Sequence, residues 1–122
     1  MTRWRWTGLV LGIALALSCE AADRARAEVR CTPAGVALTY DCLIRLTHAG
    51  TGAPLTGAQL TVAADMPSMP MAHAVKPVGA TGAGEPGLYR ARIELEMGGE
   101  WALQLTLSAP FRDRIVSRQR FD

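Results

Sequence analysis

The side chains most able to do chemistry in this 122-residue chain lie in residues 65–73. This segment, DMPSMPMAH, holds three of the five methionines and one of the two histidines. Thioether sulfur is a soft ligand that selects Cu(I), and imidazole also suits copper, whereas magnesium and calcium prefer oxygen ligands. The sequence therefore predicts a copper site whose ligands are Met66, Met69, Met71 and His73.

The backbone of this segment limits how its side chains can converge. Its prolines fix φ and remove hydrogen-bond donors, which excludes the interior of a helix or of a central strand. On an extended backbone Met69, Met71 and His73 share one face, because side chains alternate. Met66 has the opposite parity and joins them only where the chain bends near Pro67. The alternative interpretation is that these flexible methionines fill one end of a β-sandwich.

Few other residues are candidates for a functional role. Met97 and Trp101 have the parity of inward-facing residues, so we expect them to be core residues first. The indole of Trp101 could still shield a nearby Cu(I) through a cation–π contact. We interpret His48, at a predicted strand end, as a surface histidine. The chain has no H-E-x-x-H motif and no evident serine–histidine–acid arrangement, so we do not expect an enzyme.

The N-terminal region is typical of an export signal. Arg3 and Arg5 precede an apolar run at residues 8–17, and a polar stretch leads to the A-x-A cleavage pattern of residues 25–27. The apolar run is shorter than the roughly 20 residues needed to cross a bilayer. We predict a signal peptide at residues 1–27 and a periplasmic domain at residues 28–122. Lipid anchoring through Cys19 is a weaker alternative, because no leucine stands three residues before it.

Cysteines and charge are consistent with this division. Without residues 1–27, Cys31 and Cys42 remain as an even pair in an oxidising setting, which predicts a disulfide. A loop this short would stabilise the domain by about 2–3 kcal/mol in the chain-entropy account. The formal net charge is +2, and residues 1–27 carry all of this excess. The remaining domain is balanced, which argues against a nucleic-acid partner.

Alternating apolar residues predict an all-β domain. Residues 36–46 and 60–64 alternate with the period of a strand, and a last strand is expected at about residues 114–121. Residues 89–97 and 101–107 alternate on either side of Gly98-Gly99-Glu100. We predict that they form a hairpin with a three-residue loop, which pairs Met97 with Trp101. Six or seven short strands fit a Greek-key sandwich of immunoglobulin or cupredoxin type.

Three motifs together resemble the YtkA-like/FixH-like family: MPSMPMAH at residues 66–73, PGLY at 86–89 and MGGEW at 97–101. The resemblance extends over about residues 29–120. It implies a small exported β-sandwich associated with copper handling, linked in some members to cytochrome oxidase assembly. By motif, it implies that the ligands are Met66, Met69, Met71 and His73. Many relatives have a histidine-richer motif, so a single histidine after three methionines favours Cu(I) over Cu(II).

These observations predict a periplasmic Cu(I)-binding protein that acts as a copper chaperone or buffer. Its expected partners are the copper ion and a membrane cuproprotein or copper transporter. We expect no nucleic acid partner and no transmembrane span in the mature chain. The alternative is a metal-free interaction module or accessory subunit that docks a respiratory or efflux complex in the membrane.

Overall fold

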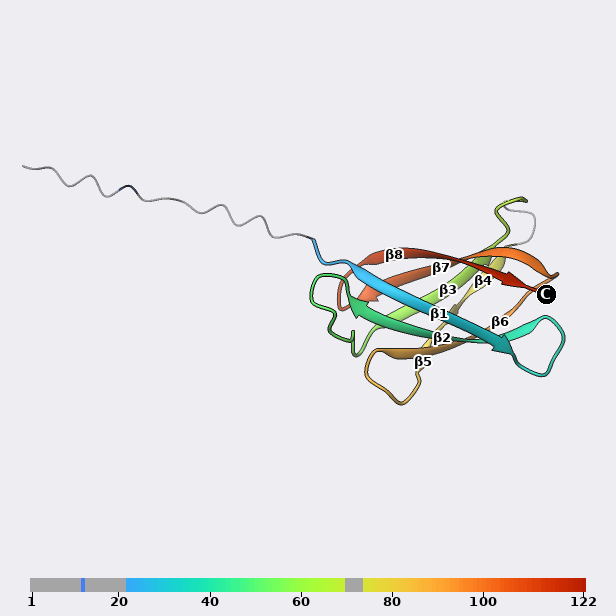
Figure 1. The fold of residues 1–122 in the computed structure, drawn as a ribbon, viewed down its shortest axis with the longest axis horizontal. Coiled ribbons are helices and arrows are strands. Elements are labelled where there is room, and N and C mark those ends of the chain that lie inside the picture. The colour runs from blue at the N-terminus through green and yellow to red at the C-terminus, as the bar shows by residue number, and fades with distance from the viewer. Residues whose placement is uncertain (1–11, 13–21, 70–73) are drawn as a thin grey trace, which may run out of the picture.

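Two antiparallel sheets of four strands each pack face to face in the computed structural model (Figure 1). The structure describes residue 12 and residues 22–69 and 74–122. Its eight strands confirm the predicted all-β sandwich, with more strands than the six or seven expected. In the described part of the chain, no helix has the length and apolar character needed to cross a membrane.

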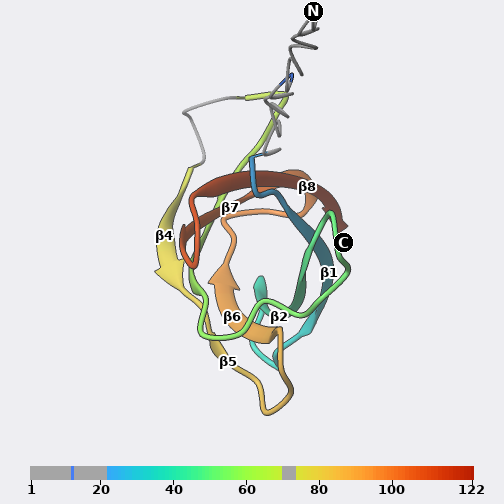
Figure 2. The ribbon, with the colours of Figure 1, turned by 90° about the vertical axis from the view of Figure 1, so that its left-hand side faces the viewer.

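Each sheet combines strands from both halves of the chain. The first has the order β1-β2-β6-β5 and consists of β1 (Ala25–Pro33), β2 (Thr39–His48), β6 (Leu88–Glu94) and β5 (Thr81–Gly82). The second has the order β4-β3-β7-β8 and consists of β4 (Val75–Gly79), β3 (Gln59–Asp65), β7 (Gly99–Ala109) and β8 (Asp113–Phe121). At one edge of the sandwich β1 lies beside β8, as the end-on view in Figure 2 shows.

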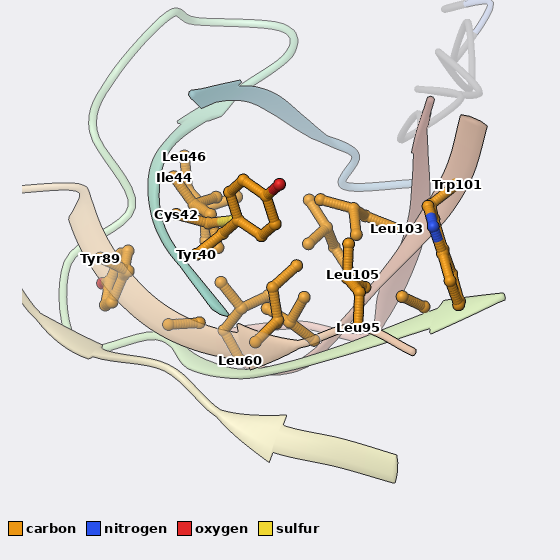
Figure 3. Packing of buried hydrophobic residues seen from close by; sticks show 14 of the residues in the cluster. Tyr40, Cys42, Ile44, Leu46, Leu60, Tyr89, Leu95, Trp101, Leu103 and Leu105 are labelled. Atoms are coloured by element: carbon orange, nitrogen blue, oxygen red, sulfur yellow. The ribbon is translucent and has the colours of Figure 1, made fainter. Parts of the chain in front are cut away.

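The core lies between the sheets and follows the alternation in the sequence. The buried hydrophobic side chains of β2 are Tyr40, Cys42, Ile44 and Leu46, and those of β7 include Trp101, Leu103 and Leu105 (Figure 3). Leu107 of β7 is buried as well. Each fully buried aliphatic side chain stabilises the fold by about 1.5–3 kcal/mol relative to exposure. The two sheets therefore form one rigid support for the loops at their ends.

The predicted disulfide is present. Cys31 of β1 lies directly opposite Cys42 of β2, with the two Cα atoms 4.0 Å apart and the sulfurs bonded. Cys42 is fully buried. The bond therefore ties the edge strand β1 to the central strand β2 and to the core.

The predicted hairpin of residues 89–107 is wrong in its pairing. β6 pairs with β2 and β5, whereas β7 pairs with β3 and β8, so the chain crosses between the sheets after Glu94. The inward parity of Leu95 and Trp101 is confirmed, because a crossing between sheets keeps both side chains in the same core. Met97 does not belong to that core, since it lies within the crossing and is 37% exposed.

The sandwich has two ends with different residues. At the first, which we call the methionine end, β3 ends at Asp65, β7 begins at Gly99 and β8 ends at Phe121. At the opposite one, the histidine end, β1 begins at Ala25 and β2 ends at His48. Figure 1 shows the two ends at opposite poles of the domain.

Candidate metal-binding end of the sandwich

The structure describes two of the four predicted copper ligands. Met66 and Met69 follow directly after β3, at the methionine end. Met71 and His73 fall within residues 70–73 and lie outside the described residues. The complete ligand set therefore stays a prediction.

A tight turn follows β3 where the sequence predicts a bend. The backbone N–H of Met69 donates a hydrogen bond of 3.0 Å to the carbonyl oxygen of Met66. Pro67 occupies the second position of this four-residue turn, where a fixed φ is favoured. The turn ends the strand alternation and gives its two methionines different surroundings. Met66 is only 6% exposed, whereas Met69 is 39% exposed.

Met66 packs at the end of the hydrophobic core against Gly99. A Cβ atom added to Gly99 would lie 3.2 Å from the Cε methyl of Met66, and the backbone there has a φ of +128°. Both facts favour glycine at this position, because a side chain would crowd the methyl and strain the backbone. Met66 therefore has a packing role, whatever else it does.

A hydrogen bond joins the two ends of the segment from Met97 to Trp101. The indole N–H of the fully buried Trp101 donates a 3.1 Å hydrogen bond to the carbonyl oxygen of Met97. Because Gly99 lies between these residues and contacts Met66, the segment belongs to the methionine end. Thioethers of Met66, Met69 and Met97 thus come from two separate parts of the chain to one end of the sandwich.

Two carboxylates at this end, those of Asp65 and Glu100, have amide or cationic partners. Asp65 accepts a 3.1 Å hydrogen bond from the side-chain amide of Gln104, and Glu100 lies 3.5 Å from Arg118. Among the residues that the structure describes, no three His, Cys, Asp or Glu side chains form a cluster able to hold a metal ion. The distinctive donor chemistry of the methionine end is therefore thioether sulfur.

His48 has a structural role at the opposite end. Its Nδ1 accepts hydrogen bonds from the backbone N–H groups of Gly50 and Thr51, at 3.0 and 3.2 Å. This leaves Nε2 to carry the proton and to donate to Asp23 Oδ1 at 2.8 Å. The ring also meets Phe111 edge-on, with centroids 5.9 Å apart. Our interpretation as a plain surface histidine missed these contacts, because its partners are distant in sequence or are backbone groups.

A nearly buried carboxylate joins the sheets beside this histidine. Asp113 Oδ2 accepts a 2.9 Å hydrogen bond from the backbone N–H of Ala25, and the Asp113 side chain is 10% exposed. This bond lowers the pKa of Asp113, with the N–H of Arg114 and the charge of Arg24 adding to the effect against the opposing influence of burial. Sequence alternation alone gave no signal for this contact between β1 and β8.

One comparison with known proteins covers most of the domain. The model of the YtkA-like family matches residues 24–106, which is well over half of the chain. No curated protein and no solved structure matches this chain. The matched range begins one residue before β1 and ends within β7, so it includes both segments of the methionine end. The chain therefore belongs to the YtkA-like family.

Proposed function

We propose that this protein is an exported Cu(I)-binding protein that holds the ion at its methionine end and acts as a copper chaperone or buffer. The observation that supports it is that Met66, Met69 and Met97 belong to one end of a rigid sandwich. Copper is the cargo of such a protein, so binding and release are its whole chemistry. No catalytic group is needed for that role.

The donor set fits the cuprous ion. Thioether sulfur is uncharged and soft, and it competes poorly for ions that prefer oxygen. Met69 and Met97 are each more than one-third exposed and accessible to an incoming ion. Met71 and His73 follow within four residues of Met69 and would supply further sulfur and one imidazole nitrogen. The buried Met66 would join them or support the turn that presents them.

The disulfide is consistent with export. Disulfides form and persist in oxidising compartments, including the bacterial periplasm, and are rare in reducing ones. The Cys31–Cys42 pair joins two strands and leaves neither sulfur as a thiolate ligand. A periplasmic location would make a membrane cuproprotein or a copper transporter the natural donor or acceptor of the ion.

A titration with Cu(I) against a competing chelator tests this function. The protein is purified from the exported fraction, so that its disulfide is formed. The variant combines Met66→Leu, Met69→Leu and Met71→Leu, because leucine keeps side-chain volume while removing sulfur. We expect stoichiometric binding in the natural protein and loss of at least roughly 100-fold in affinity in the variant, the upper range for residues that only support ligands.

A fluorescence signal can locate the bound ion. Trp4 and Trp6 lie in the predicted signal peptide, so Trp101 would be the only tryptophan of the processed protein. Its indole is buried and bonded to Met97, and its emission should change as Cu(I) binds. Natural protein that binds more weakly than micromolar would contradict the proposal and favour a metal-free interaction module.

A further inference from the structure

The first three residues of β1 are those of the A-x-A pattern predicted as a cleavage site. Ala25 pairs with His48, Arg26 with Thr47 and Ala27 with Leu46, in continuous antiparallel register. Ala25 and Ala27 also pack against the hydrophobic core. A cut after Ala27 would therefore remove the first third of an edge strand rather than a linker.

Two residues before the strand are also fixed to the domain. Asp23 Oδ1 lies 2.8 Å from Nε2 of His48, and the carbonyl oxygen of Arg24 accepts a 2.8 Å hydrogen bond from the N–H of Ala49. Arg24 further approaches Asp113 at 3.6 Å. These contacts extend the folded domain to Asp23.

The contact between Ala25 and Asp113 would be lost with such a cut. The Asp113 carboxylate is nearly buried, and its Oδ2 accepts the N–H of Ala25 at 2.9 Å. Removing residues up to 27 would take away both this donor and the neighbouring guanidinium of Arg24. The N–H of Arg114 would remain bonded to Asp113. Loss of the other two partners would still be unfavourable, because less of the desolvation of this carboxylate would be compensated.

We infer that processing on export retains Asp23 to Ala27, and that the chain is hydrolysed between Ala21 and Ala22. Cys19 and Ala21 supply the small residues that a signal peptidase requires three positions and one position before the cut. Water adds across the Ala21–Ala22 peptide bond, which gives a carboxylate on Ala21 and a free amine on Ala22. The family match, which begins at residue 24, agrees with a domain that begins before β1.

Intact-mass measurement and N-terminal sequencing of the exported protein test this inference, using cells that express the full chain. We expect a first residue of Ala22. A chain that starts at a lipid-modified Cys19 would also retain Asp23 but would overturn the assigned cut between Ala21 and Ala22, and its added lipid mass would identify it. A first residue of Glu28 would overturn it.

A pair of matched variants makes the assignment independent of folding. Ala21→Val places a branched side chain immediately before the inferred cut, and Ala27→Val does the same at the A-x-A pattern. We expect Ala21→Val to accumulate precursor or shift the cut, whereas Ala27→Val is processed like the natural chain. Both masses can be read from denatured samples. The reverse pattern would overturn the inference.

Discussion

At the histidine end, imidazole, carboxylate and backbone groups satisfy one another, and both nitrogens of His48 are engaged in hydrogen bonds. At the methionine end, the neighbouring carboxylates of Asp65 and Glu100 have partners, while Met69 and Met97 expose their side chains. Imidazole is an ordinary metal ligand and thioether a rarer one. The comparison teaches that partners, rather than residue type, decide which end is available to bind an ion.

The largest expected effect is a difference in stability between substitutions of two methionines at the same end. Met66→Ala should lower the free energy of unfolding by about 2–5 kcal/mol, because it leaves a cavity at the end of the core. Met69→Ala should change it by no more than about 0.5 kcal/mol, as expected for an exposed side chain. Urea denaturation of the metal-free proteins measures both. Equal losses in the two variants would show that Met66 is not a packing residue.

The two histidines provide a test of which end binds copper. His73→Gln should weaken Cu(I) binding by roughly 10–100-fold, since it removes the imidazole of the predicted site. His48→Gln is the matched control and should leave copper affinity unchanged while lowering stability, because its hydrogen bonds at the histidine end are altered. Chelator competition and urea denaturation supply the two readouts. Copper loss in His48→Gln alone would reverse our assignment of the ends.

The contact between β1 and β8 can be weakened by one charge. Asp113→Asn keeps an acceptor oxygen for the N–H of Ala25 but removes the charge assistance, which we expect to cost about 1 kcal/mol. Thermal or urea unfolding measures this loss. The substitution should not alter Cu(I) affinity, because the strand registers place Asp113 at the end remote from Met66. A change in affinity would indicate that the two ends are coupled.

A smaller effect concerns acid stability at the histidine end. The pKa of Asp113 is lowered in the folded protein, chiefly by the N–H of Ala25. Its contribution to stability is therefore present above the unfolded-state pKa of about 3.9 and is lost as pH falls through the lower folded-state pKa. Unfolding measured at neutral and acidic pH should show a smaller pH dependence in Asp113→Asn than in the natural protein. An identical dependence would contradict this role.

Acidification should also weaken the exposed pair of Asp41 and Arg92. The hydrogen bond from Arg92 lowers the pKa of Asp41, and the two groups lie 2.9 Å apart on the solvent-facing side of the first sheet. Because this pair is exposed, added salt should screen it, whereas the bond of Asp113 to Ala25 should depend less on salt. Repeating the pH comparison in high salt separates the two carboxylates.

At the candidate site, the local sequence predicted the turn but not the residues that pack against it. The prolines and the change of parity at Met66 predicted a bend, and a hydrogen-bonded turn begins there. That Met66 packs on Gly99 depends on a contact between segments 33 residues apart, which no local pattern specifies. The exposure of Met97 was not predicted, because we assigned it an inward-facing position on a strand that continued into a hairpin.

The error over the hairpin has a clear physical origin. Alternation of apolar and polar residues predicts which side chains face the core. The pattern is the same whether two strands share a sheet or lie in opposite sheets. The glycine-rich segment at residues 98–100 suits a tight turn, yet the chain crosses from β6 to β7 at residues 95–98, and residues 99 and 100 already belong to β7. Both edges of each strand are already paired within its own sheet. β6 lies between β2 and β5, and β7 lies between β3 and β8, so β6 and β7 do not pair with each other.

The sequence by itself determined the all-β class, the buried positions of the strands and the Cys31–Cys42 disulfide, because these follow from side-chain alternation and from an even pair of cysteines. Tertiary structure alone decided strand order, the engagement of His48 with Asp23, and the approach of Gly99 to Met66. Each of these joins residues that are not neighbours in the chain. Their energies depend on the packing of the whole sandwich rather than on any local preference.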